Sequence, residues 1–239
     1  MGAYFGQDVE VVVDRLLDEP LDYGGWNREA ERGSTRGSFH TTICVLEGLL
    51  EYERATGGSA EVAAARVGGQ GYLLDRRMFR RLSNGEVVDP AWTRFSFPTW
   101  WHDDGLRGLD HLRSAGAEPD ERWAAAIELV ESKRGDEGRW LLENPHPGRV
   151  HVEVDEGEGN PSRWNTLRAL RVLDRYAQSG QTAGRPDAWV FDQRRNRRPS
   201  SERRRATARS ASVQLHRSPC GTPASTCSTW APHPAQAIF

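Results

Sequence analysis

The residues best suited to chemistry lie in one short stretch, FPTWWHDDGLRGL, at positions 97–109. Two adjacent carboxylates follow a histidine there, and two tryptophans precede it. A buried carboxyl group beside an imidazole can act as an acid, and indole faces can stabilise a cation. We therefore take His102, Asp103 and Asp104 as candidate catalytic residues. Trp100 and Trp101 are candidate ligand-binding residues.

A structural interpretation of the same stretch stays open beside the catalytic one. The two carboxylates would complement the dipole of the helix that follows, and the tryptophans would fill gaps in the packing. Adjacent carboxylates on a helix also point about 100° apart, so we do not expect them to share a proton as a facing pair.

This stretch contains one of three similar helical segments. ICVLEGL, LRGLDHL and LRALRVL begin at residues 43, 106 and 167, with apolar residues at their first, fourth and seventh positions. That spacing places an apolar stripe on one helix face. The lead-ins SFHTT and SRWNT predict serine N-caps at Ser38 and Ser162. Pro98 and Thr99 predict the helix start in the middle copy.

Aligning the three segments predicts a site. Three positions before the first apolar residue stand His40, Asp103 and Trp164. If the three helices surround one cavity in the same orientation, these residues meet at one of its ends, where helix N-termini favour an anionic group. The predicted pocket rim consists of His40, Trp100, Trp101, His102, Asp103, Asp104 and Trp164.

A zinc site is another interpretation of part of this set. His40 and Cys44 lie four residues apart on one helix face, and His102 and Asp104 would complete four ligands. The alternative is a small buried thiol beside a hydrogen-bonded histidine. Such pairs arise often by chance, so we predict neither a metal nor a cofactor.

A second repeated element supplies the connections. VDRLLDEPLDYGGW (13–26) and IELVESKRGDEGRW (127–140) both end in Asp-x-Gly-x-Trp. This pattern predicts a helix, a glycine-permitted reversal and a structural tryptophan, Trp26 or Trp140, beside the helix end. Further helices are expected at 59–82, with an interruption at glycines 68–71, and at 120–134. Because only short pieces such as 150–154 alternate like a strand, the fold class is all-α, built from helical hairpins.

Composition divides the chain into two unlike parts. Residues 177–239 hold ten arginines against three acids, a net charge of +7, and the total of −2 leaves −9 for residues 1–176. Cys44, Cys220 and Cys227 are too few and scattered for a disulfide framework. The chain shows neither a signal-peptide pattern at its start nor an apolar run of about 18 residues, so we expect a cytoplasmic protein without a membrane span.

The order of these segments resembles the terpenoid cyclase and protein prenyltransferase superfamily, in particular its bacterial squalene-cyclase-like or prenyltransferase-like proteins. The resemblance rests on GGWN, SFHTTICVLEGL, FSFPTWWHDDGLRGLDHL, GRW and SRWNTLRALRVL, within residues 8–176. It implies an α/α toroid, in which outer helices surround an inner barrel and the ends of the inner helices line a cavity. A complete ring holds about six hairpins. This chain shows about half of them, so the resemblance implies a partial toroid.

The motifs of that superfamily are incomplete in this chain. Squalene cyclases carry Asp-x-Asp-Asp, and the stretch His102–Gly105 is one acid short. Arg107 stands where the metal-binding Asp-Asp-x-x-Asp motif would place its third acid. Three functions stay open: an isoprenoid cyclase or transferase relative that binds an apolar small molecule, a non-catalytic scaffold, or a carbohydrate-active toroid. A homodimer is a further expectation, and nucleic acid is not an expected partner.

The sequence predicts a domain boundary near the end of the third segment. Residues 1–178 form the predicted toroid domain, and residues 179–239 form a low-complexity, basic tail without periodicity that we expect to be disordered. Three interpretations of the tail stay open. It is a basic arm for nucleic acid, a segment without a role, or the product of a shift in reading frame near residue 180, since GC-rich DNA read out of frame yields Arg, Pro, Ser and Ala.

Overall fold

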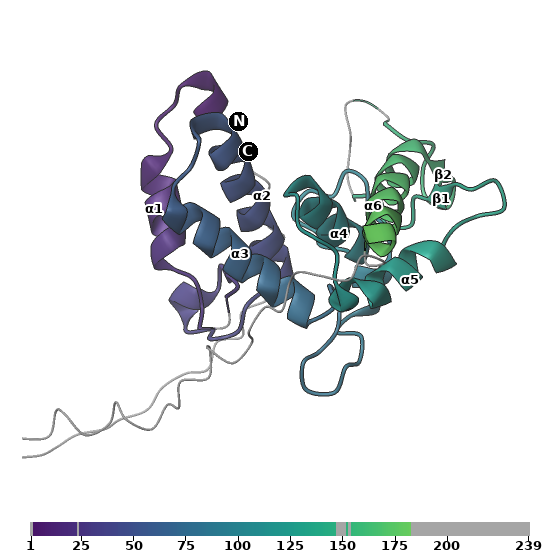
Figure 1. Ribbon diagram of the computed structural model, residues 1–239, viewed down its shortest axis with the longest axis horizontal. Helices are drawn as coiled ribbons and strands as arrows, with labels where there is room; N and C mark the ends of the chain where they lie inside the picture. The colour runs from purple at the N-terminus through teal and green to yellow at the C-terminus, as the bar shows by residue number, and fades with distance from the viewer. Residues whose placement is uncertain (1, 23, 147–151, 153, 183–239) are drawn as a thin grey trace, which may run out of the picture. The chain divides into compact units, whose positions relative to one another are not determined.

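The computed structural model of the protein describes residues 2–22, 24–146, 152 and 154–182 (Figure 1). Within these residues the chain is mainly helical, with one two-stranded antiparallel sheet, so the broad all-α expectation is confirmed. The described α-helices are α1 (Glu10–Asp18), α2 (Phe39–Thr56), α3 (Ala60–Asp75), α4 (Gly105–Ser114), α5 (Ala124–Ser132) and α6 (Arg163–Thr182). The strands are β1 (Trp140–Leu141) and β2 (Pro161–Ser162), and the 3-10 turns are η1 (Gly2–Phe5), η2 (Ala30–Arg32), η3 (Pro90–Thr93) and η4 (Glu121–Trp123).

The described α-helices pack in two rows. α4 contacts both α2 and α6, so these three helices are successive neighbours. α3 packs on α2, and α5 packs on α4. α1 contacts α3, and η4 at the start of α5 contacts α3 as well, so α1, α3 and α5 follow one another in the second row. Figure 1 shows α3 beside α2 and α5 beside α4.

The apolar stripes of the first two repeated segments form the centre of the core. Each of their residues is completely buried, because a helix of the second row covers the stripe. Burying a leucine or isoleucine side chain contributes about 1.5–3 kcal/mol. The six residues are Ile43, Leu46, Leu49, Leu106, Leu109 and Leu112.

Two tryptophans join the rows in the same way. The indole of Trp26 donates to the carbonyl oxygen of Leu16 at 2.8 Å, and its backbone amide donates to Oγ1 of Thr42 at 3.0 Å. Trp140 repeats both hydrogen bonds, to Val130 at 2.6 Å and to Thr166 at 3.0 Å. We call this pair of bonds the tryptophan latch. It confirms the predicted structural role of both tryptophans, and Gly24 and Gly138 precede them with positive φ angles.

The glycine-rich part of 59–82 differs from the expectation. α3 continues through glycines 68–71 and ends at Asp75. A Cβ atom at Gly69 would lie 2.5 Å from the Trp26 ring and 2.8 Å from a methyl group of Leu46. The glycine therefore lets the latch tryptophan approach the helix backbone, and it does not interrupt the helix.

The helix starts confirm two of the three predictions. Ser38 accepts a hydrogen bond from the amide of Thr41, and Ser162 accepts one from the amide of Asn165. The middle start was predicted wrongly, because α4 begins at Gly105 with Asp104 as its N-cap and not near Pro98. Asp103 thus lies before its helix, whereas His40 and Trp164 lie in the first turns of theirs.

The end of α6 passes the predicted domain boundary at residue 178 and reaches Thr182. The remainder of the predicted tail, 183–239, lies outside the described residues, and the strand expected at 150–154 falls largely outside them too. Across the described ranges, no helix combines the length and the apolar character that crossing a membrane requires.

Candidate functional site

His40 and Asp103, two of the three residues that the alignment placed together, meet where α2 approaches the start of α4. The backbone amide of Asp103 donates a 2.8 Å hydrogen bond to Nδ1 of His40. The rings of His40 and His102 lie 5.0 Å apart, measured between their centroids. Because Nδ1 accepts, the neutral imidazole of His40 carries its proton on Nε2. Burial, together with the charges of the nearby His102 and Arg107, lowers the pKa of His40 to about 4, so the neutral form prevails at neutral pH.

The carboxyl group of Asp103 is buried, and its Oδ1 has no hydrogen-bond partner. Burial raises the pKa of Asp103 well above its ordinary value, and the adjacent Asp104 raises it further. The positive charge of Arg107 opposes both effects only in part. Asp103 is therefore protonated more readily than an exposed aspartate, which is the direction that an acid needs.

Asp104 has a different role. Its two carboxylate oxygens accept from the amide of Arg107 at 2.8 Å and from the amide of Ser96 at 3.0 Å. The first of these is the N-cap bond of α4. This geometry supports the structural interpretation for Asp104, which holds the helix start and the preceding loop together.

Arg107 joins the two helices beneath this loop. Its guanidinium binds Glu47 through two hydrogen bonds, of 2.9 and 2.7 Å, and it also donates to the carbonyl oxygen of His102 at 2.7 Å. Burial alone would lower the pKa of Arg107, but the hydrogen bonds and charge of Glu47 outweigh it and raise that pKa. The arginine therefore serves the contact between α2 and α4.

Trp100 and Trp101 lie on the other side of the loop and are 55% and 57% exposed. Their rings approach the ring of His146, with centroids 4.7 and 4.8 Å away. Trp100 has a φ of 49°, a left-handed value uncommon for a residue with a side chain. The turn it makes lets both indoles reach the same histidine.

A pocket of about 190 Å³ opens beside Trp101. Nε2 of His102 and Nε2 of His146 are both buried without a hydrogen-bond partner, and both histidines line this pocket. The other lining residues are Ala91, Ser96, Pro98, Thr99, Trp101, Asn144 and Pro145. It therefore combines one indole with several groups that can donate or accept hydrogen bonds.

Trp164 does not line that pocket. Its ring stacks on Phe97, with centroids 5.1 Å apart and planes 13° from parallel, and its indole donates to the carbonyl oxygen of Val154. The structure thus brings His40, His102 and Asp103 together and places Trp100 and Trp101 around His146. Trp164 contacts the beginning of the same loop.

Sequence reasoning missed His146 and Asn144. Both follow β1 in the short segment Asn144-Pro145-His146, where a single histidine in a proline-rich loop gives no periodic or spacing signal. Asn144 donates to Oγ of Ser96 at 3.0 Å, and this bond places it at the pocket. For metal binding, the described residues contain no group of three or more His, Cys, Asp or Glu side chains arranged to hold an ion.

Comparisons of the chain with protein-family models, with curated proteins and with solved structures found no match.

Proposed function

We propose that the protein is a small-molecule-binding domain of α/α-toroid type, and that the pocket beside Trp101 takes a compact, uncharged ligand of carbohydrate type. The observation that carries this proposal is the pair of buried, unpartnered histidine nitrogens in a pocket that also presents an indole. A buried polar atom without a partner costs free energy, and a ligand hydroxyl group would remove that cost by binding it.

The row arrangement supports the toroid part of the proposal. In an α/α toroid an inner row and an outer row alternate along the chain. Here α2, α4 and α6 are neighbours in one row and α1, α3 and α5 follow in the other, with the chain alternating between them. The tryptophan latch repeats at the same point of two hairpins, as expected for a repeated architecture. This pattern agrees with the superfamily that the sequence resembles, although a fold does not specify a ligand.

The ligand class follows from the size and lining of the pocket. Ligand pockets usually have volumes of about 300–1,000 Å³, and about 190 Å³ leaves too little room for a long isoprenoid chain. The lining offers a hydroxyl group at Ser96, an amide at Asn144 and two imidazoles, which suit the hydroxyl groups of a sugar ring. The exposed face of Trp101 suits the apolar face of such a ring.

The proposal concerns binding and assigns no reaction. The pocket lining includes His102 but not Asp103, and the side chain of Asp104 already accepts the N-cap hydrogen bond of α4. A ligand in the pocket would therefore meet imidazole, amide and hydroxyl groups before any carboxyl group. This arrangement favours the non-catalytic alternative over acid catalysis.

Binding titrations would test the ligand class. The full chain is titrated with glucose, galactose, N-acetylglucosamine and farnesol, and binding is followed by tryptophan fluorescence and calorimetry. We expect a saturable signal for at least one sugar and about a tenfold weaker affinity for Trp101→Ala, which corresponds to about 1.4 kcal/mol. Trp164→Ala is the matched control, because this tryptophan is also partly exposed but lies outside the pocket.

Two outcomes would contradict the proposal. Saturable binding of farnesol alone would favour the isoprenoid alternative. Sugar binding that Trp101→Ala leaves unchanged would place the ligand elsewhere on the protein.

A further inference from the structure

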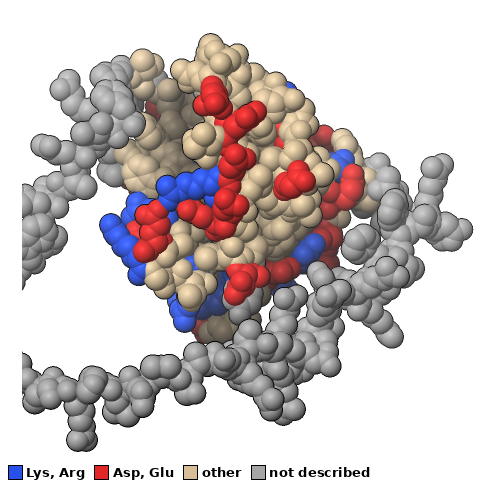
Figure 2. All heavy atoms as spheres, turned by 90° about the vertical axis from the view of Figure 1, so that its left-hand side faces the viewer, with Lys and Arg blue, Asp and Glu red and all other residues tan. Residues whose placement is uncertain are grey.

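A second pocket, of about 570 Å³, lies where the start of α2 meets the end of α3. Among the described residues that line it there are four arginines and neither an aspartate nor a glutamate. Residues 1–176 carry a net charge of −9, and a band of acidic side chains crosses the side of the molecule shown in Figure 2. A pocket lined by arginines without acids is therefore unexpected in this part of the chain. We call it the arginine pocket, after Arg36, Arg76, Arg80 and Arg81.

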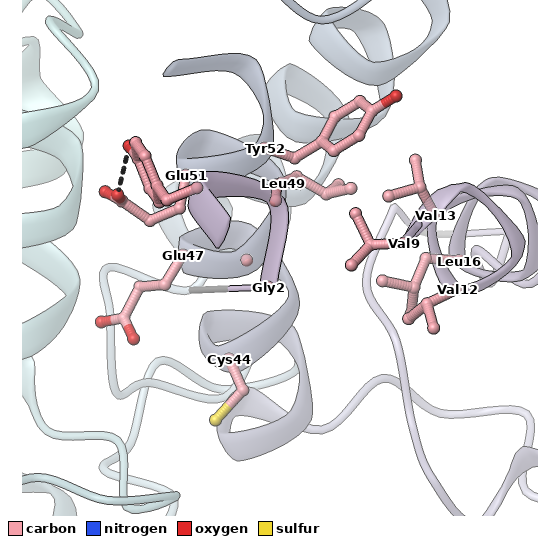
Figure 3. Close-up of a pocket in the computed structure, with 13 residues that line it drawn as sticks. Gly2, Val9, Val12, Val13, Leu16, Cys44, Glu47, Leu49, Glu51 and Tyr52 are labelled. Atoms are coloured by element: carbon pink, nitrogen blue, oxygen red, sulfur yellow. Dashed lines mark hydrogen bonds between the residues drawn. The ribbon is translucent and has the colours of Figure 1, made fainter. Parts of the chain in front are cut away.

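The groove between α1 and α2 has a different character. Its volume is about 410 Å³, and Figure 3 shows the apolar side chains of α1 extending toward α2, with Glu47 and Glu51 on the other side of the view. No arginine belongs to its described lining. Of these two pockets, the arginine pocket alone offers cationic side chains to a ligand.

Tyr72 holds one side of the arginine pocket in place. Its hydroxyl group donates to the carbonyl oxygen of Gly37 at 2.6 Å, which fixes the loop before α2 against α3. The guanidinium of Arg76 lies over the Tyr72 ring, 3.8 Å from its centroid, and donates to the carbonyl oxygen of Tyr72 at 3.1 Å. The tyrosine therefore brings Arg36, in the loop, and Arg76, at the end of α3, to the same pocket.

The segment after α3 turns back on itself and supplies the other two arginines. The amide of Val88 donates to the carbonyl oxygen of Phe79 at 2.9 Å, which closes the turn. The guanidinium of Arg80 donates to the carbonyl oxygen of Gly85 at 2.9 Å, and that of Arg81 donates to the carbonyl oxygen of Val88 at 3.2 Å. Nε of Arg80 is buried without a hydrogen-bond partner. Backbone carbonyl groups thus hold both side chains without neutralising their charge.

The charge of the arginine pocket is not balanced by ion pairs. In the described part of the chain, none of its four guanidinium groups pairs with a carboxylate. The acids close to it in sequence have other partners. Asp75 pairs with Arg122 at 3.0 Å, and Glu86 accepts from the side-chain amide of Asn84 at 2.7 Å. Asp89 caps η3. The arginines are therefore free to bind an anion.

The remaining lining suits the other parts of an anionic ligand. Ser38 and Phe39 lie at the start of α2, and a helix N-terminus favours a negative charge. The side chains of Leu82, Val88 and Trp92 form an apolar wall. Ligand pockets usually have volumes of about 300–1,000 Å³, so about 570 Å³ has room for an organic group beside the anion.

We propose that the arginine pocket binds a small organic phosphate, with the phosphate group on the guanidiniums and the organic group against the apolar wall. Guanidinium groups bind phosphate through two parallel N–H bonds, which are among the strongest hydrogen bonds in proteins. A phosphate monoester carries a charge of about −1.5 to −2 at neutral pH, so four arginines favour it over a carboxylate. The proposal does not depend on the ligand proposed above, because the two pockets share no lining residue.

Three probes separate the parts of such a ligand. Adenosine monophosphate carries a phosphate monoester on an organic group, adenosine lacks the phosphate, and inorganic phosphate lacks the organic group. The full chain is titrated with each by calorimetry at low ionic strength. We expect saturable binding of adenosine monophosphate, about tenfold weaker binding of inorganic phosphate and no saturable signal for adenosine. Added salt should weaken the binding of both phosphates.

Substitutions locate the binding, because the ten arginines of residues 177–239 also attract phosphate. Arg36→Gln and Arg81→Gln each remove one guanidinium at an exposed position, where the fold should persist. We expect the double variant to bind adenosine monophosphate at least about tenfold more weakly than the wild type. Arg171→Gln is the matched control, because Arg171 is also exposed and lies outside the pocket, and it should bind like the wild type. Circular dichroism and thermal melting check that each variant is folded.

Four results would overturn the proposal. The first is the absence of saturable binding of adenosine monophosphate, including a case in which the protein binds only vesicles that contain phosphatidic acid. The second is equal affinity for adenosine and its monophosphate, since the phosphate group would then contribute nothing. The third is inorganic phosphate that binds as tightly as the monophosphate, which would exclude the apolar wall. The fourth is a folded double variant with the affinity of the wild type, which would place the phosphate elsewhere on the chain.

Discussion

Nδ1 of His40 accepts a 2.8 Å hydrogen bond from the backbone amide of Asp103, and this bond ties the loop before α4 to the first turn of α2. The bond needs a neutral imidazole, since a protonated Nδ1 cannot accept. The contact between the two helices is therefore sensitive to acid at this point.

The first prediction concerns His40. Its pKa is about 4 in the folded protein and near 6.5 in the unfolded chain, so its contribution to stability is present above pH 6.5 and is lost as the pH falls through about 4. In His40→Asn an amide oxygen can accept in place of Nδ1 without titrating. We expect the unfolding free energy of the wild type to fall relative to the variant between pH 6.5 and 4. Urea unfolding measures this free energy. A difference between the wild type and His40→Asn that stays constant from pH 6.5 to 4 would contradict the prediction. His111, whose pKa is also about 4, is present in both proteins and cancels.

The second prediction concerns Asp103, whose contribution to stability changes with pH in the direction opposite to that of His40. Its pKa is raised in the folded state, so its contribution to stability is fully present below the unfolded pKa near 3.8 and is lost as the pH rises through the folded value. Asp103→Asn keeps the shape and removes the titration. We expect the variant to gain stability relative to the wild type as the pH rises from 4 to 8, and denaturant unfolding across that range measures the gain. If the unfolding free energies of Asp103→Asn and the wild type depend on pH in the same way, the carboxyl group is not desolvated in the folded protein.

The third prediction uses the neighbouring acid. Asp104→Ala removes the N-cap of α4 and leaves the amide of Ser96 without its acceptor, so we expect a loss of about 1–2 kcal/mol in the unfolding free energy at neutral pH. Asp104→Asn is the matched control, because asparagine also caps helices well, and it should lose less. An alanine variant as stable as the wild type would indicate that the cap contributes little.

The fourth prediction compares two adjacent glycines of α3. Gly69→Ala forces a methyl group against the Trp26 ring, and overpacking of this kind costs about 1–3 kcal/mol. Gly68→Ala has open space and should stabilise the helix by up to about 1 kcal/mol. Thermal and urea unfolding of both variants measure the difference. Equal effects of the two substitutions would rule out the close approach of Trp26 to α3.

The fifth prediction tests the tryptophan latch. Trp140→Phe keeps most of the buried ring but removes the indole donor to the carbonyl oxygen of Val130, which then accepts only from the amide of Lys133 at 3.3 Å, so we expect a loss of about 1 kcal/mol. Trp100→Phe, at an exposed position, should change stability by about 0.5 kcal/mol or less. A latch variant with no greater loss than this control would show that the indole bond is not a significant source of stability.

The sequence predicted the helical repeat well, because its signals are local. Ser38 and Ser162 cap helices through contacts only three residues away, and the glycine before each latch tryptophan marks a reversal. The same local reasoning failed at α4. Pro98 and Thr99 are acceptable helix starters, but Asp104 also accepts from the amide of Ser96, and the fold of the intervening loop decides between the candidates.

The candidate site was predictable only in part. Helical spacing and the repeat predicted that His40 and Asp103 lie close together, since each stands three residues before the apolar stripe of its own segment. The same alignment placed Trp164 beside them, but the Trp164 ring stacks on Phe97. His146 reaches Trp100 and Trp101 from a loop more than forty residues later, and no periodicity connects them. The neutral state of His40 and the raised pKa of Asp103 depend on burial at a helix junction, which a sequence pattern does not report.

The tryptophan latch also bears on how the chain acquires its structure. Its bonds span ten residues from indole to carbonyl, and 16 or 26 residues from amide to threonine, so each latch closes over a short loop. Short loops lose little entropy on closing, and chains dominated by them fold quickly. The two latched segments should thus form separate early folding units, the first of them during synthesis, before the second has left the ribosome.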